Sequence, residues 1–169
     1  RKKTVDGIDA VVVRDTVTDN NGDLVEVTDD WYAQDSDGNI WYLGEDTWDG
    51  DSGGSFIAGC DGAEAGIVML GTPAKGDFYQ QEFYAGEAED WGKVLNFVPI
   101  DELICLKIKE WNPLDPGHVE HKYYCSDGAT GQLALIEELK GKTVIVDMLD
   151  TNVAAPPPPA APPSPIPDC

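Results

Sequence analysis

Apolar and polar residues alternate in short runs along the first 150 positions, and turn-forming residues interrupt them about every 8–12 residues. In one clean run, Leu106, Ile108 and Glu110 fall on one face of an extended strand, and Lys107 and Trp111 fall on the other. This periodicity predicts a chain built almost entirely of short strands. The predicted strands are Val11–Val13, Leu24–Tyr32, Ile40–Leu43, Ser55–Ala58, Gly66–Leu70, Phe78–Tyr84, Lys93–Val98, Leu103–Trp111, Val119–Cys125, Leu133–Leu139 and Thr143–Leu149.

About ten short strands separated by regular turns predict an all-β fold, either an antiparallel barrel or a sandwich, with a calycin-like barrel as one form. Two segments also allow one or two helical turns. They are Gly86–Leu95 and Leu133–Lys140, although Gly92 weakens the first and the strand that follows favours a hairpin for the second. We expect one β-domain over residues 1–150 and a separate tail over residues 151–169.

One hairpin can be predicted with its register. The turn-forming residues Asp35–Gly38 separate two aromatic-rich segments. If these four residues form the loop, Tyr32 faces Trp41 and Trp31 faces Tyr42 across the strands. Cross-strand aromatic pairs of this kind contribute about 0.2–1 kcal/mol each.

The tail differs sharply in composition from the domain before it. Residues 156–167 contain eight of the twelve prolines. Proline has no backbone N–H, so this segment cannot join a sheet and should form an extended polyproline II helix. We expect it to dock on a partner through Pro156, Pro157, Pro158, Pro159, Pro162, Pro163, Pro165 and Pro167. The candidate residues for an aromatic groove that would accept it are Trp31, Trp41, Tyr42, Trp48 and Trp91.

The charge distribution excludes some classes of partner. The net charge is −21, and no Lys or Arg occurs between Arg14 and Lys75, a stretch that holds 14 Asp or Glu. Such a surface repels nucleic acid and anionic membranes. Its ordinary role is to keep the protein soluble, and the alternative is attraction of divalent cations or of a basic partner. No apolar run is long enough for a membrane-spanning helix.

Four cysteines, Cys60, Cys105, Cys125 and Cys169, lack the C-x-x-C spacing of a zinc site and fit two disulfides. Disulfides indicate an oxidising compartment, so we expect an extracellular or cell-surface protein. In the predicted hairpin Cys105 lies near Tyr124, and a change of one residue in register would place it against Cys125. Cys60 would then remain for Cys169, within one chain or between two. The competing pair is Cys60 with Cys125.

The sequence gives little sign of catalysis. The two histidines, His118 and His121, are three residues apart on one predicted strand and therefore lie on opposite faces. Acidic residues next to aromatic ones could build a sugar-binding or glycosidase site, but they are too numerous to discriminate. These acids are Glu45, Asp46, Glu87, Glu89 and Asp90.

Calcium is the one cofactor considered. Asp35, Asp37 and Asn39 resemble the start of a calcium-binding loop, but Ile40 stands where that loop needs glycine at its sixth position. Turn chemistry explains the same residues. We therefore expect no cofactor apart from this calcium candidate.

Three stretches together resemble a family of uncharacterised secreted β-rich domains of bacteria and some algae. They are Asp30–Asp35 continuing into Gly38–Asp46, then Tyr79–Asp90, then Glu110–Leu114 with Glu120–Tyr124. The resemblance covers roughly residues 5–140 and implies a secreted β-fold without an established activity. The family pattern implies small residues where Cys60 and Cys125 stand. Separately, Pro162–Pro165 resembles hydroxyproline-rich stretches of algal and plant extracellular glycoproteins, which implies hydroxylated and O-glycosylated prolines.

We expect an extracellular, non-catalytic structural or assembly module whose tail docks on a neighbouring copy or another surface protein, as in a filament or a cell-surface matrix. The alternative is a calycin-like protein that binds a small ligand or a carbohydrate. A third hypothesis, hydrolase activity, depends on Glu45, Glu87 and Glu89.

Overall fold

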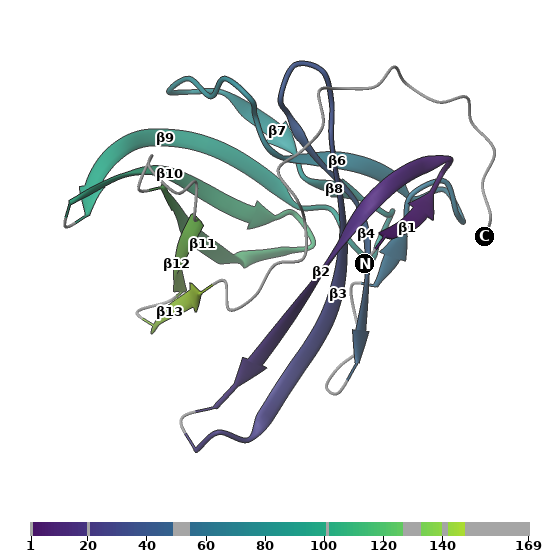
Figure 1. Cartoon of the computed structure of the whole chain (residues 1–169), viewed down its shortest axis with the longest axis horizontal. Helices are drawn as coiled ribbons and strands as arrows, with labels where there is room; N and C mark the ends of the chain where they lie inside the picture. Colours follow the sequence, from purple (N-terminus) through teal and green to yellow (C-terminus); the bar gives the residue numbers. More distant parts are fainter. Residues whose placement is uncertain are drawn as a thin grey trace. The chain divides into compact units, whose positions relative to one another are not determined.

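A computed structural model of the chain describes residues 2–19, 21–48, 55–100, 102–126, 133–139 and 142–147, and of residues 48, 126, 133–139 and 142–147 it describes the backbone alone. Within these residues every regular element is a β-strand, which confirms the predicted all-β fold (Figure 1). The helical alternatives are wrong, because Leu133–Leu139 is a strand and residues 86–90 form turns and a bridge before a strand begins at Trp91. This part of the chain has no helix that could span a membrane.

The strands form two antiparallel sheets. The first has the order β1-β2-β3-β4-β6-β8, with the short β5 paired to β4. Its strands are β1 (Lys2–Val5), β2 (Ile8–Thr18), β3 (Leu24–Gln34), β4 (Ile40–Trp48), β5 (Phe56–Ile57), β6 (Glu64–Met69) and β8 (Glu82–Phe83). Figure 1 shows β2 and β3 as a long hairpin that extends beyond the neighbouring strands.

The second sheet has the order β13-β12-β11-β10-β9-β7. Its strands are β7 (Phe78–Gln80), β9 (Trp91–Ile100), β10 (Leu103–Asn112), β11 (Asp115–Ser126), β12 (Leu133–Leu139) and β13 (Lys142–Asp147). Each sheet runs between two different edge strands, so among the described strands neither sheet closes into a barrel. Barrel closure, one of the two predicted forms, is therefore not adopted by either sheet.

The described residues divide into two compact units. Unit 1 comprises those up to residue 72 together with 80–89, and unit 2 comprises 73–79 and those from 90 onward. The predicted tail, residues 151–169, lies outside the described residues. Unit 1 carries the first sheet, and most of the second sheet belongs to unit 2.

Strand β1 was not predicted, because Lys2–Val5 has no alternating apolar pattern. It exists because Asp6 and Gly7 both adopt positive φ, +47° and +73°, and form a two-residue turn that sets Val5 against Ile8. Asp-Gly is the preferred sequence for this turn, whose backbone twist matches that of the strands it joins. This dipeptide is the signal that could have revealed the hairpin.

The β3–β4 hairpin has a different register from the predicted one. Tyr32 faces Tyr42 and Ala33 faces Trp41, whereas Trp31 faces Gly44 across an irregularity in the pairing. The predicted pairs were therefore wrong. The loop is one residue longer than expected, because the backbone of Asp35 donates to the carbonyl oxygen of Asn39 at 3.0 Å and so includes Asn39 in the loop.

Unit 1 has two adjoining hydrophobic clusters. One consists of Val5, Ala10, Trp31, Leu43 and Ala58, and the other of Tyr42, Phe56, Ala63 and Ala88. Gly44 allows the chain to pass closely between them. A Cβ at this position would lie 2.3 Å from the Phe56 carbonyl oxygen, and its φ of +137° also disfavours a side chain.

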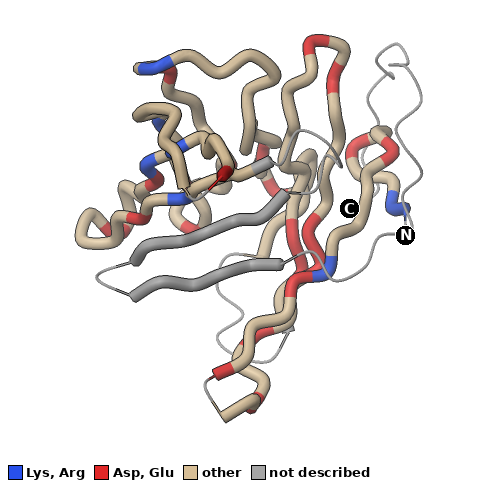
Figure 2. The backbone as a smooth tube through the Cα atoms, turned by 60° about the vertical axis from the view of Figure 1, so that its left-hand side comes forward, with Lys and Arg blue, Asp and Glu red and all other residues tan. Residues whose placement is uncertain are grey.

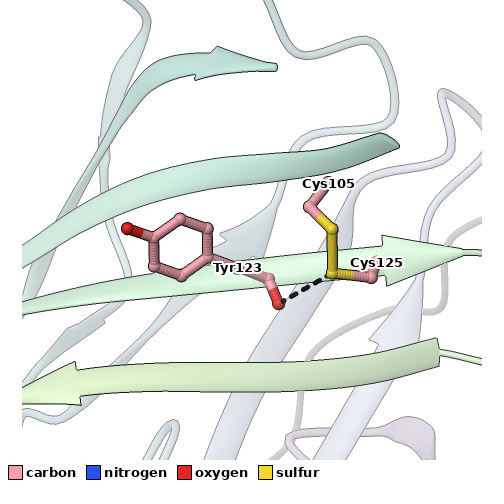
Figure 3. Close-up of a disulfide and its surroundings, with 3 residues drawn as sticks. All are labelled: Cys105, Tyr123 and Cys125. Atoms are coloured by element: carbon pink, nitrogen blue, oxygen red, sulfur yellow. Dashed lines mark hydrogen bonds between the residues drawn. A yellow bond between two sulfur atoms is a disulfide. The ribbon is translucent and has the colours of Figure 1, made fainter. Parts of the chain in front are cut away.

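In unit 2 the predicted faces of β10 are confirmed, since Leu106, Ile108 and Glu110 are buried. Cys105 and Cys125 stand directly opposite each other on β10 and β11 and form a disulfide (Figure 3). The one-residue change of register is therefore the arrangement adopted. It arises because β11 begins at Asp115, inside the segment predicted as loop, and the pairing shifts after Trp111.

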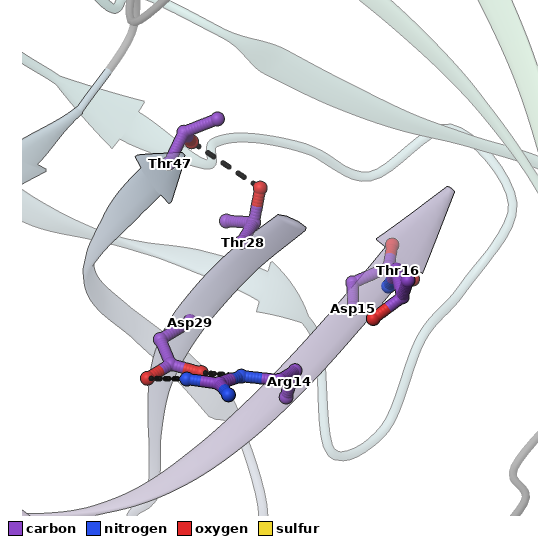
Figure 4. Close-up of polar contacts among 6 residues, drawn as sticks. All are labelled: Arg14, Asp15, Thr16, Thr28, Asp29 and Thr47. Carbon is purple, nitrogen blue, oxygen red and sulfur yellow. Dashed lines mark hydrogen bonds and ion pairs between the residues drawn. The ribbon is translucent and has the colours of Figure 1, made fainter. Parts of the chain in front are cut away.

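Acidic residues occur along both the strands and the turns of unit 1, as the charge distribution predicted (Figure 2). Arg14, the last base before Lys75, is not isolated among them. Its guanidinium group lies against Asp29 on the neighbouring strand (Figure 4). On the same strand as Asp29, the hydroxyl of Thr28 lies 3.2 Å from that of Thr47 on β4. Polar cross-strand pairs thus stabilise a sheet that carries a large negative charge.

Candidate functional site

Unit 1 contains a pocket with a volume of about 320 Å³. The first sheet and the turn between β5 and β6 supply most of its lining. In the described part of the chain, the residues that line it are Lys3, Trp31, Glu45, Asp46, Ser55, Phe56, Ile57, Cys60, Asp61, Ala63 and Tyr84. Three aromatic rings, one ammonium group and three carboxylates therefore meet around one hollow. We call this site the Trp31 pocket.

The ammonium group of Lys3 lies over the ring of Trp31, 3.2 Å from its centroid. A cation is attracted to the negative face of an indole, and partial burial strengthens the attraction. Burial lowers the pKa of Lys3, while the charges of Asp46 and Asp29 oppose this shift. Lys3 thus fixes a positive charge in a site that is otherwise acidic, and it comes from β1, the strand that the sequence did not reveal.

A buried hydroxyl links two acids beside the pocket. The Tyr42 hydroxyl lies 2.6 Å from Oδ1 of Asp30 and 2.8 Å from Oε2 of Glu45. Asp30 and Glu45 are direct cross-strand partners, so one phenol lies between two facing carboxyl groups. Burial, followed by the charges around it, strongly raises the pKa of Tyr42, so it stays a hydrogen-bond donor.

Tyr42 is held in place by two other rings. It stacks on Tyr32 with ring centroids 5.0 Å apart, and it meets Phe56 edge to face at 5.4 Å. Phe56 also lines the Trp31 pocket. Tyr42, which contacts the two acids, and Phe56, which lines the pocket, therefore belong to one aromatic cluster.

Cys60 lies in the turn that closes the pocket on one side. Its N–H donates to the Ile57 carbonyl oxygen at 3.1 Å, and its own carbonyl oxygen accepts from Ala63 at 2.8 Å. Asp61 next to it adopts a positive φ of +50°. Cys60 is a disulfide-bonded cysteine with 9% of its surface exposed. Its predicted partners were Cys125, which is bonded to Cys105, and Cys169, which lies outside the described residues.

The predicted groove residues have different environments. Trp31 lines the pocket, and Tyr42 is buried behind it. Trp41 is half-buried and donates from its indole nitrogen to Oδ2 of Asp35 at 2.8 Å. Trp91 belongs to unit 2, and the side chain of Trp48 lies outside the described part of the chain. The eight tail prolines also lie outside it.

The residues considered for calcium form a network of loop hydrogen bonds. Asp35 accepts the backbone N–H groups of Asp37 and Asn39, both at 2.9 Å, and also the Asn39 amide and the Trp41 indole. The hydrogen bonds from Trp41 and Asn39 lower the pKa of Asp35 to about 2. Asn39 Oδ1 in turn accepts from the N–H of Gly71 at 2.9 Å. Among the described residues no group of three or more His, Cys, Asp or Glu could hold a metal, and calcium binding stays a prediction.

Two of the candidates for catalysis, Glu89 and His118, make contacts within the fold. Glu89 accepts from the backbone of Gly86 at 2.9 Å across a turn. His118 lies 2.7 Å from Glu120, and Lys122 bridges to the buried Glu110 at 2.9 Å. The Glu89 contact stabilises a turn and the Lys122–Glu110 contact joins β11 to β10, whereas His118 and Glu120 lie on the same strand.

Unit 2 carries a row of three aromatic rings that was not predicted from the sequence. Trp91 and Trp111 are direct partners on β9 and β10 and stack with centroids 6.4 Å apart. Phe78, which is 65% exposed, lies 5.9 Å from Trp91. The ammonium group of Lys109 lies 5.5 Å from the Trp111 centroid. The row was missed because Trp111 and Phe78 become neighbours of Trp91 only through strand pairing.

Comparison with protein-family models, with curated proteins and with solved structures finds no match for this chain. The resemblance to secreted β-rich domains stays a prediction.

Proposed function

We propose that the protein is an extracellular, non-catalytic assembly module that joins copies of itself by docking the proline-rich tail of one copy into the Trp31 pocket of another. The observation that carries this proposal is the pocket itself, in which Trp31, Phe56 and Tyr84 line a hollow next to a disulfide-bonded cysteine. Proline rings pack well against aromatic side chains, and a polyproline II segment loses little conformational entropy on docking.

Charge supports a ligand of this kind. Among the described residues that line the pocket, Glu45, Asp46 and Asp61 are acidic and Lys3 is the one base, so the pocket disfavours an anionic ligand. The tail from Thr151 to Cys169 contains no base and only one acid, Asp168. The tail is therefore nearly neutral and largely apolar. As a ligand it suits this pocket better than most other segments of the chain, which are more acidic.

Two further observations support an extracellular, structural role. The disulfide between Cys105 and Cys125 is consistent with an oxidising compartment. In addition, Glu45 and Glu89, two of the three acids considered for hydrolysis, accept hydrogen bonds from Tyr42 and Gly86. These bonds give both acids a role in holding the fold.

The test compares the full chain with a full-length variant in which all eight tail prolines are replaced by serine. Sedimentation velocity is measured over a range of concentrations in a glutathione buffer that allows disulfides to exchange. We expect the natural chain to associate and the serine variant to stay monomeric. Equal association of the two proteins would disprove the proposal, as would equal association of a chain that ends at Asp150.

A second candidate function is carbohydrate binding, and the aromatic row of unit 2 is the observation that favours it. Sugar rings pack their C–H faces against exposed aromatic side chains, and Phe78, Trp91 and Trp111 offer adjacent rings on one sheet. Affinity electrophoresis in gels containing neutral polysaccharides tests this function. Trp111→Ala should abolish retardation if it is right, and Trp41→Phe serves as the control outside the row.

A further inference from the structure

The aromatic row of unit 2 has two bases beside it. Trp91 and Trp111 are direct partners on β9 and β10, and two residues further along each strand Lys93 and Lys109 are direct partners as well. Alternate residues of a strand share a face, so these two indole rings and two ammonium groups lie together on one face of the second sheet. We call these four residues the Trp–Lys block.

The block lies in the part of the chain where the acidic excess is smallest. Residues 1–72 and 80–89 contain 4 bases and 19 acids, whereas residues 73–79 and 90–126 contain 5 bases and 7 acids. Strand β9 contains no acid, and the one acid of β10, Glu110, is buried on the opposite face. The block is therefore a local positive patch on a chain whose other charges are mostly negative.

Lys93 and Lys109 face each other without a compensating acid. Like charges on direct cross-strand partners destabilise a sheet. Lys93 is exposed, and in the part of the chain that the structure describes neither ammonium group forms an ion pair with a carboxylate. The ammonium group of Lys109 lies near the ring of Trp111, 5.5 Å from its centroid. An anion bound between the two ammonium groups would remove their repulsion, so the arrangement favours a negatively charged ligand.

The aromatic rings indicate the rest of the ligand. Trp91 stacks on Trp111 with centroids 6.4 Å apart, and Phe78, which is 65% exposed, lies 5.9 Å from Trp91. Aromatic rings of this kind pack against the C–H faces of sugars. We propose that the Trp–Lys block binds a polyuronate, an acidic polysaccharide, with its sugar rings on the aromatic row and its carboxylates at Lys93 and Lys109. This inference names the ligand class of the second candidate function and rests on that function, but it does not depend on the tail.

The charge of the whole chain selects among polyanions. Nucleic acids bind mainly through the number of anionic groups that bases neutralise, as do heavily sulfated glycans, and the block offers two bases. The net charge of −21 also opposes such ligands. A polyuronate carries one carboxylate per ring and gains further affinity from its sugar faces. At physiological ionic strength, charges more than about 8 Å away are largely screened, so the distant acids do not prevent two ammonium groups from holding its carboxylates.

Isothermal titration calorimetry of the full chain with five probes tests the ligand class. The probes are an oligogalacturonate, its methyl ester, polyglutamate, a heparin oligosaccharide and a thymidine oligonucleotide. The methyl ester keeps the sugar rings without the charge, and polyglutamate keeps the carboxylates without the sugar. We expect the oligogalacturonate to bind about tenfold more tightly than each of the others. Equal binding of the methyl ester, or equal or tighter binding of any other probe, would overturn the inference.

Substitution of the two lysines tests the site. Lys93→Gln and Lys109→Gln should each weaken oligogalacturonate binding about threefold, and the double variant about tenfold. The double variant removes a like-charge pair, so its melting temperature should be no lower than that of the natural chain, which separates lost binding from lost folding. Lys2→Gln, at an exposed position of β1, is the matched control, because it changes the net charge as much as each single variant. Equal weakening by Lys2→Gln would overturn the assignment to the block.

Trp111→Ala separates this inference from the carbohydrate-binding function. We expect it to weaken oligogalacturonate binding at least as much as the double lysine variant does. If Trp111→Ala abolishes equal binding of the oligogalacturonate and its methyl ester, carbohydrate binding stands and the acidic ligand class fails. If binding requires the two lysines but not Trp111, the block binds anions without a sugar platform, and both the carbohydrate function and this inference fail.

Discussion

Arg14 on β2 and Asp29 on β3 stand directly opposite each other and form a two-pronged ion pair, from Nε to Oδ1 at 2.8 Å and from Nη2 to Oδ2 at 2.9 Å (Figure 4). The side chain of Asp29 is 11% exposed, whereas that of Arg14 is 51% exposed. The hydrogen bonds with Asp29 raise the pKa of Arg14. One exposed base thus compensates a buried carboxylate in the long β2–β3 hairpin.

Arg14→Ala should lower the melting temperature by several degrees, because it takes away the two hydrogen bonds that the guanidinium group makes to the buried Asp29 carboxylate. Arg14→Lys should recover only part of the loss, because an ammonium group cannot form both parallel hydrogen bonds. Circular dichroism melts of these variants, of Asp29→Asn and of the double variant measure the coupling. If the stability losses of the two single variants simply add in the double variant, the two side chains have no coupling energy and the prediction is contradicted.

Tyr42→Phe should lower the free energy of unfolding by about 1–3 kcal/mol. The substitution removes the buried hydroxyl that lies between Asp30 and Glu45 but keeps the ring that packs on Tyr32. Urea denaturation measures the change. Asp30→Asn in the Tyr42→Phe background should recover part of it, because one of the two facing charges is gone. An unchanged free energy of unfolding in Tyr42→Phe would contradict the stabilising role given to this hydroxyl.

Replacing both Cys105 and Cys125 by alanine should cost about 3 kcal/mol of stability, the value expected for a disulfide that closes a loop of this size. The two residues are 20 positions apart and are almost fully buried. Guanidinium denaturation measures the loss. Cys60→Ser is the comparison, because it removes the other disulfide and leaves this hairpin intact. A loss under 1 kcal/mol for the alanine pair would contradict the prediction.

Asp35 should make stability depend on pH under acidic conditions. Hydrogen bonds from Trp41 and Asn39 lower its pKa to about 2, whereas an unfolded chain has an Asp pKa of about 3.9. A lowered pKa means that the folded state binds the proton less tightly. Its stabilising contribution is therefore present above pH 4 and is lost as the pH falls from about 4 to about 2.

Denaturation midpoints between pH 2 and 6 test this dependence on the natural chain and on Asp35→Asn. In Asp35→Asn, the decrease in stability between pH 4 and pH 2 that comes from Asp35 should be absent. Asp37→Asn, in the same loop, is the matched control. The prediction fails if Asp35→Asn keeps the slope of the natural chain.

The sequence predicted the strands well because their signals are local. Alternation identified which residues of β10 share a face, and β-branched and aromatic runs identified most of the other strands. Strand β1 was missed because two lysines and a threonine dominate it. The β3–β4 register could not be predicted, because it depends on the side chain of Asp35, which brings Asn39 into the loop.

The candidate site was less predictable for a physical reason. The Trp31 pocket brings together Lys3, Trp31, Cys60 and Tyr84, which lie on separate segments and meet only after the first sheet forms. Trp31 and Cys60 were identified from the sequence as a groove aromatic and a disulfide cysteine. Nothing local placed them together, and Lys3 and Tyr84 carried no sequence signal.

The proposed assembly depends on the Trp31 pocket as the binding site of the proline-rich tail. The most direct test adds a synthetic peptide of residues 151–168 to the ¹⁵N-labelled full-length variant whose eight tail prolines are serine, and follows the tryptophan indole N–H signals by NMR. Single Trp→Phe variants assign these signals. We predict that the Trp31 signal shifts in a saturable way while the Trp111 signal stays in place. A response confined to Trp91 and Trp111, or no response at all, would contradict the account.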